Sequence, residues 1–118
     1  MKEHKSLLAS AARTATNTTY HTLGSSGGHF IIDCTVDPAA ASITFTVQGI
    51  DATSGKAYTI LASAAVAAVG TTVLTIFPGA AETANVSAND FLPQTIALVA
   101  THADADSMTY SVTFNGFN

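Results

Sequence analysis

The residues best suited to chemistry in this chain are His102, Asp104 and Asp106, which alternate along one short segment. Alternating oxygen donors of this kind can hold a divalent cation, as they do at the start of a calcium-binding loop. Such a loop continues to a glycine and a distal glutamate, whereas here Ser107-Met108-Thr109 leads directly into a strand-like segment. The spacing therefore favours a structural turn and no bound metal.

A second segment, Gly49 to Lys56, resembles a phosphate-binding loop but lacks two of its parts. Five residues separate Gly49 from Gly55, where the motif has four, and Ala57 stands where Ser or Thr is needed. The segment also lies between two predicted strands, so no helix N-terminus is available to bind a phosphate. It is interpreted as a hairpin turn.

Cys34 is the only cysteine, which excludes an internal disulfide bond. In an extended strand its side chain shares a face with Phe30 and Ile32, which predicts burial, while His29 and Asp33 point to the opposite face. No cysteine–histidine pair is therefore expected. Because the remaining histidines show no metal-ligand spacing either, the sequence predicts no catalytic residue, no cofactor and no metal site.

The elements around these residues show a two-residue alternation of apolar and hydroxyl-bearing side chains. It is clearest from Ile43 to Gln48 and from Met108 to Phe114. Alternation with period two is typical of a β-strand with one buried and one solvent-facing side. The solvent-facing positions carry Thr, Ser and Gln, so the expected outer surface is polar but nearly uncharged.

Turn-forming clusters divide the chain into seven or so short strands, which predicts an all-β fold, an antiparallel β-sandwich with an open barrel as the alternative. Residues 6–16 fit either a helix or a strand, and the Thr-rich continuation favours the strand. Residues 17–28 are predicted to be a loop, and residues 80–90 an exposed excursion. The other expected strands cover residues 30–36, 42–50, 56–63, 71–77, 94–101 and 108–114.

We expect a single domain, with an N-terminal extended arm and loop (residues 1–28) on a β-sandwich body (residues 29–118). Residues 1–13 hold Lys2, Lys5 and Arg13 against Glu3, whereas the rest of the chain holds Lys56 against seven acidic residues. A basic arm on an acidic body could lie across an acidic neighbour, including another copy. Lys2, Lys5 and Arg13 are therefore the candidate partner contacts, and the alternative is an ordinary ragged terminus.

Charged residues make up 10% of the chain and hydrophobic residues 47%. Because a free, concentrated protein normally carries more surface charge, we expect this surface to meet other protein, including a homo-oligomer. The longest apolar run, Ile60 to Val69, is too short to span a bilayer, and the N-terminus lacks the apolar core of a secretory signal. The acidic body argues against nucleic acid as a partner.

Four stretches of the chain resemble small virion proteins encoded among the head genes of tailed bacteriophages. They are Leu7 to Thr16, Ser54 to Ser63, Gly70 to Leu74 and Thr101 to Ser107. Such proteins are commonly small β-domains that bind the assembled capsid lattice. The resemblance thus implies a structural role on the capsid surface of a virion, made in the host cytoplasm, with the major capsid protein as partner.

The function predicted from the sequence is a non-enzymatic capsid decoration or cement protein. A carbohydrate-binding domain, or an accessory protein of the tail or of head completion, is the alternative. Sugar platforms rely on exposed aromatic side chains, and this chain has no Trp and 8% aromatic residues. An enzyme is least supported, because neither paired carboxylates nor a nucleophile with its base can be placed together.

Overall fold

The computed structural model describes residues 2–117, which form nine β-strands and no helix. No segment of this range is therefore a helix of the length and apolarity needed to cross a membrane. The predicted all-β class is confirmed. The strands are β1 (Lys2–Arg13), β2 (Asn17–Thr22), β3 (Gly27–Cys34), β4 (Ile43–Ile50), β5 (Ala57–Ala62), β6 (Gly70–Ile76), β7 (Ser87–Ala88), β8 (Thr95–His102) and β9 (Met108–Phe117).

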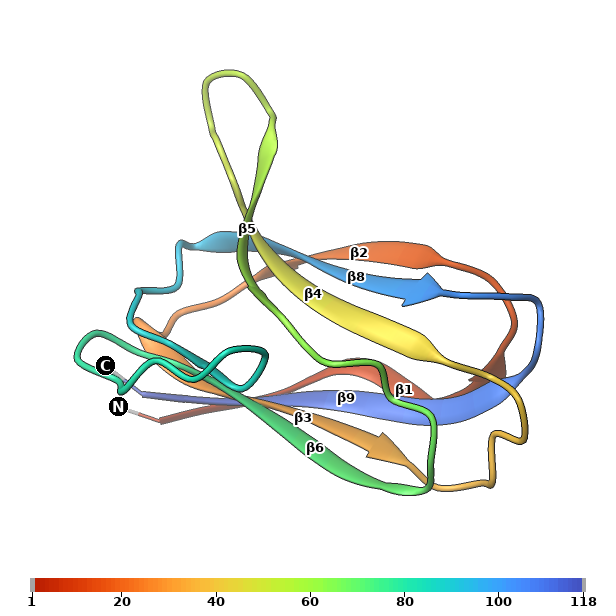
Figure 1. The fold of residues 1–118 in the computed structure, drawn as a ribbon. Helices are drawn as coiled ribbons and strands as arrows, with labels where there is room; N and C mark the ends of the chain where they lie inside the picture. The colour runs from red at the N-terminus through yellow and green to blue at the C-terminus, as the bar shows by residue number, and fades with distance from the viewer. Residues whose placement is uncertain (1, 118) are drawn as a thin grey trace.

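The strands form two sheets that stack as a sandwich (Figure 1). One sheet has the order β1-β9-β3-β6-β7 and the other the order β2-β8-β4-β5. Neighbouring strands are antiparallel except for the short β6–β7 pair, which is parallel. Because the two sheets remain separate, the fold is the predicted sandwich rather than the open barrel.

The core lies between the sheets and consists of the inward-facing side chains of the alternating strands. Phe30 and Phe114 pack with ring centroids 4.9 Å apart, and Phe45 meets Tyr110 edge-on at 5.1 Å. All four are fully buried. Burial of one such side chain contributes roughly 1.5–3 kcal/mol. The contact of Phe45 on β4 with Tyr110 on β9 joins the two sheets, whereas Phe30 and Phe114 are cross-strand neighbours within the five-stranded sheet.

The predicted N-terminal arm is not confirmed, because residues 2–13 form edge strand β1 and pair with β9. The register shifts on both sides of Leu8, which lets the consecutive residues Leu7 and Leu8 both reach the interior. A regular strand would have turned one of them to solvent. The loop predicted over residues 17–28 is also wrong, since it contains β2 and the start of β3. Residues 2–28 are therefore part of the sandwich.

Two smaller expectations differ in outcome. The strand expected over residues 30–36 ends earlier, because β3 ends at Cys34, and Val36 beyond it is 55% exposed. The predicted hairpin turn after β4 is confirmed, and the β4–β5 hairpin projects from the body (Figure 1). In this turn the Asp51 carboxylate accepts the Thr53 N–H at 2.9 Å, and Gly55 adopts φ +75°, a conformation that favours glycine.

Candidate functional site

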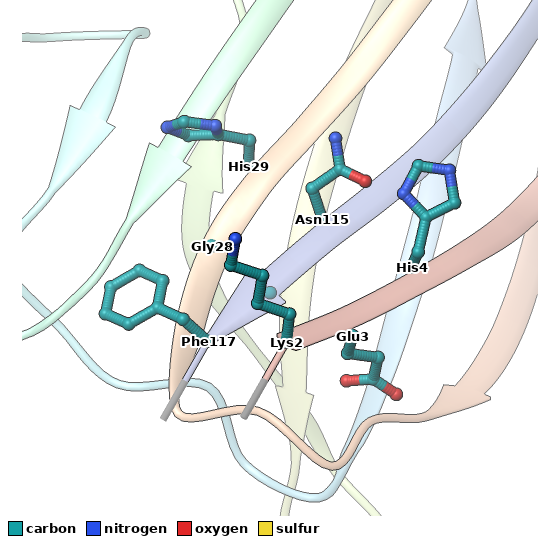
Figure 2. Close-up of a pocket in the computed structure, with 8 residues that line it drawn as sticks. Lys2, Glu3, His4, Gly28, His29, Asn115 and Phe117 are labelled. Carbon is teal, nitrogen blue, oxygen red and sulfur yellow. The ribbon is translucent and has the colours of Figure 1, made fainter.

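A hollow of about 540 Å³ lies on the outer face of the five-stranded sheet, where the ends of β1, β3 and β9 meet (Figure 2). We call it the terminal pocket. His4, Asn115 and His29 are direct neighbours across these three strands. The pocket is lined by Lys2, Glu3, His4, Gly28, His29, Asn115, Gly116 and Phe117.

The side chains of the terminal pocket are not arranged for acid–base chemistry. Glu3 supplies the pocket's one carboxylate, and this group accepts the Gly24 N–H at 3.0 Å and the Ser25 hydroxyl at 2.9 Å. It is thus committed to the loop between β2 and β3. Across residues 2–117 no group of three or more His, Cys, Asp and Glu side chains is placed to hold a metal ion.

The three predicted contact residues occupy different surroundings. Lys2 is exposed beside the terminal pocket (Figure 2). Lys5 Nζ donates to the Thr22 carbonyl at 2.8 Å, which links β1 to β2. The Arg13 guanidinium donates to the carbonyls of Ala9 at 2.7 Å and Tyr110 at 2.7 Å. Two of the three basic groups therefore hold the two sheets or the strand edge in place, and the three are not gathered in one patch.

A polar cluster at the other end of the sandwich joins the two sheets. The Tyr110 hydroxyl accepts the Asn17 amide at 3.1 Å and lies 3.1 Å from His102 Nε2. Arg13 stacks on the Tyr110 ring at 4.7 Å. Burial is the main factor that raises the pKa of Tyr110 and lowers that of His102. These shifts favour the neutral form of both groups, as expected for a structural contact.

His102, Asp104 and Asp106 do not converge on a common point. His102 turns inward to Tyr110, while the Asp104 carboxylate accepts the Asp106 N–H at 3.0 Å and shapes the turn. Asp104 and Asp106 are both exposed. The predicted structural turn is confirmed.

Cys34 is buried as predicted, with 1% of its surface exposed. Burial is the first cause that raises its pKa, and its Sγ lies 3.4 Å from the Val36 carbonyl as a weak donor. A buried thiol whose thiolate form is disfavoured is a packing group rather than a nucleophile.

The outward side chains of the four-stranded sheet form a surface that we call the neutral face. None of its four strands contains Asp, Glu, Lys or Arg. Their two histidines, His21 and His102, alternate with the outward residues, so their side chains point inward, toward the five-stranded sheet. The face consists of Thr18, Tyr20, Thr22, Thr44, Thr46, Gln48, Ile50, Thr59, Ala62, Thr95, Val99 and Thr101, with Ala97 at an outward register position but buried. The low charge is evident in the sequence, but its concentration on one sheet is seen only in the structure.

The tyrosines divide between packing and surface. Tyr110 is buried, whereas Tyr20 is 68% exposed and Tyr58 is 46% exposed. Tyr58 lies against Gly49 across the projecting hairpin, where a side chain at residue 49 would collide with its ring. Tyr20 stands on the neutral face at the edge strand β2.

Comparisons with protein-family models, with curated proteins and with solved structures find no match to this chain.

Proposed function

We propose that this protein is a non-enzymatic structural protein of a tailed-bacteriophage virion, a decoration or cement protein that binds the major capsid protein lattice. The observation that carries the proposal is the neutral face: a whole sheet surface without a charged side chain. The resemblance of four stretches of the chain to phage head-gene products implies that the partner is the major capsid protein. The protein would act on the capsid surface, after synthesis in the host cytoplasm.

The physical reason is the cost of removing charge from water. A contact that buries an ion without a matched partner loses several kcal/mol, whereas Thr, Ala and Val side chains lose little. The neutral face can therefore be covered by another protein without such a penalty. Its hydroxyl and amide groups, such as Gln48 and Thr46, remain able to donate and accept hydrogen bonds across the contact.

The size of the face sets a condition on binding. Four strands about 4.8 Å apart and about seven residues long cover roughly 19 Å by 23 Å, or about 450 Å². A standard interface buries about 800 Å² per partner. One neutral face is thus too small for stable attachment by itself. Additional contacts near Lys2, or several copies acting together, must supply the rest.

Co-sedimentation with empty mature capsids tests the proposal. We expect wild-type protein to sediment with capsids and not with purified tails. Thr46→Lys places a charge in the middle of the neutral face and should reduce capsid binding at least tenfold, about 1.4 kcal/mol. Thr113→Lys is the matched control, because Thr113 has the equivalent outward position on β9 of the other sheet.

Other outcomes would change the assignment. Binding to tails alone would make the protein a tail or head-completion component. Binding to neither particle, with specific signals on a glycan array, would favour a carbohydrate-binding domain built around exposed aromatic residues such as Tyr20. Equal loss of capsid binding in Thr46→Lys and Thr113→Lys would remove the neutral face from the mechanism.

A further inference from the structure

Strand β2 has a free edge. The Leu23 N–H donates to the Gln94 carbonyl at 2.7 Å, so the odd-numbered residues of this strand direct their backbone groups toward β8. In an antiparallel pair the alternate residues direct theirs the other way. The N–H and C=O groups of Thr18 and Tyr20 thus point away from β8, and β2 is the last strand of its sheet.

Each of the other three sheet edges within residues 2–117 carries a feature that interrupts or covers part of it. In β1 the register shifts twice, and Arg13 donates to the edge carbonyls of Ala9 and Ala11. Strand β7 is two residues long. Along β5, the Asn85 amide donates to the Ala62 carbonyl at 3.0 Å. Bulges, short strands and covering groups of this kind prevent the addition of a further strand.

Strand β2 carries only one such feature, the Lys5 side chain at the Thr22 carbonyl, which leaves the edge groups of Thr18 and Tyr20 uncovered. Its pairing with β8 has no register shift, and its sequence Asn-Thr-Thr-Tyr-His-Thr contains no proline and no Asp, Glu, Lys or Arg. We propose that β2 pairs antiparallel with β2 of a second copy of this chain about a two-fold axis. The two four-stranded sheets then continue into each other, and their neutral faces form one surface.

The hydrogen bonds of β2 select the register of this pair. The Thr22 carbonyl already accepts from Lys5, so a register centred on Tyr20 would have to displace that contact. A register centred on Thr19 instead pairs Thr18 of each copy with Tyr20 of the other through the free groups. Each exposed Tyr20 ring then lies beside a Thr18 side chain, a favourable type of cross-strand pair.

The charges at the two ends of β2 favour the same antiparallel arrangement. Lys5 binds at the Thr22 end of the strand. The other end adjoins the β8–β9 turn, because the His102 N–H donates to Thr16 Oγ1, and this turn carries Asp104 and Asp106. A two-fold axis across β2 brings Lys5 of each copy toward the acidic turn of the other. Arg13 lies at the acidic end as well, bound to backbone carbonyls of its own copy, and its positive charge offsets part of the charge of Asp104 and Asp106.

The pairing deepens the proposed function, because a dimer would double the neutral face to roughly 900 Å², above the amount a standard interface requires of one partner. It is nevertheless tested without capsids. If the dimer forms and capsid binding fails, the edge proposal stands and the capsid proposal falls. If capsids bind a monomer, the reverse holds.

Sedimentation velocity of the full chain over a range of concentrations tests the pairing. We expect wild-type protein to dimerise, and Tyr20→Lys to raise the dimer Kd about tenfold or more by placing like charges beside the axis. Thr95→Lys is the matched control, because this exposed residue lies on the same face but on β8, whose two edges are both paired. It should leave the Kd within about twofold.

A cross-link tests the register. Thr19→Cys puts two thiols opposite each other at the axis, within the Cα separation that a disulfide needs, and should give a covalent dimer on mild oxidation. Ser111→Cys, outward on the other sheet, should not. The proposal is overturned by a protein that stays monomeric up to about 1 mM, by a dimer that Tyr20→Lys leaves unchanged, or by equal cross-linking of both cysteine variants.

Discussion

The two sheets of the sandwich share one core but differ in where they carry charge. The five-stranded sheet holds every Asp, Glu, Lys and Arg found in a strand: Lys2, Glu3, Lys5 and Arg13 in β1, and Asp33 in β3. The four-stranded sheet holds none. Glu3, Lys5 and Arg13 of β1 bind backbone groups and close the edge of the sandwich, whereas the uncharged sheet leaves one edge and one face open.

This difference shows that low overall charge is not spread evenly as a general property of the surface. The remaining charged residues lie in turns, such as Asp51 and Lys56 in the turn between β4 and β5. Charge is thus kept at the ends of the sandwich and along β1. The arrangement separates a sheet whose edge is built for stability from a sheet whose surface is suited to contact with protein.

The largest expected effect comes from removing residues 2–13, which form the charged edge strand β1 of the five-stranded sheet. Leu7 and Leu8 are both buried, and their loss costs about 3–6 kcal/mol before any strand pairing is counted. The free energy of unfolding of a native domain is only about 5–15 kcal/mol in total. We expect the truncated chain to lose cooperative thermal unfolding, measured by circular dichroism, whereas Lys2→Ala should retain it. A truncated chain that melts like wild type would restore the interpretation of this segment as a free arm.

The next effect concerns the contact that joins the two sheets at Tyr110. Tyr110→Phe removes the hydroxyl that accepts the Asn17 amide and contacts His102. It leaves the partly buried His102 Nε2 without its partner and the Asn17 amide with only the 3.4 Å contact to the Ala15 carbonyl. Such a loss should lower the free energy of unfolding, measured by urea denaturation, by about 1–3 kcal/mol. Tyr20→Phe is the matched control, because the Tyr20 ring is 68% exposed, and it should change stability by less than about 0.5 kcal/mol. Equal effects would show that the cluster at Tyr110 does not couple the sheets.

The regular part of the fold could be predicted because its strands alternate cleanly. In β4 and β9 every second residue is apolar and buried, so period two fixes which face enters the core. The hairpin turn beginning at Asp51 follows from side-chain hydrogen bonding and a glycine at positive φ. These signals are local, and local signals are what a single sequence contains.

The missed elements depend on tertiary contacts instead. In β2 the inward residues are Asn17, Thr19 and His21, whose polar groups find partners such as Tyr110, so no apolar alternation marks the strand. In β1 the register shifts place two consecutive leucines inside, which period two does not predict. The neutral face was present in the sequence as four segments without charge, but only the sheet order shows that they adjoin.

A smaller effect is expected from acid, and it falls mainly on the uncharged sheet. Burial lowers the pKa of both His21 and His102 below the ordinary value of 6.5. The positive charge of Lys5 lowers the pKa of His21 further. At His102, Asp104 raises the pKa and Arg13 lowers it, but burial has the largest effect. The unfolded chain therefore binds protons first as the pH falls below 6.5. The free energy of unfolding should decrease in this range and be fully retained above it.

Urea denaturation between pH 7 and pH 5 measures this effect apart from Asp51, whose pKa lies below 3.8. The double variant His21→Gln with His102→Gln should have a flatter dependence on pH than wild type. His4→Gln, on the outer face of the other sheet, should keep the wild-type slope. If His4→Gln flattens the dependence of the free energy of unfolding on pH and the double variant does not, the acid sensitivity lies in the five-stranded sheet.

The smallest effect on stability is expected from a charge on the open surfaces, and it bears most directly on why the two sheets differ. Thr46→Lys and Thr113→Lys each place one lysine on a central strand with its side chain toward solvent. Surface changes of this kind alter the free energy of unfolding by about 0.5 kcal/mol or less, so both variants should unfold in urea at nearly the wild-type midpoint. If they do, folding does not require the four-stranded sheet to be uncharged, and its neutrality must serve contacts outside the chain. A cost of more than about 2 kcal/mol confined to Thr46→Lys would instead tie the absence of charge to packing within the sandwich.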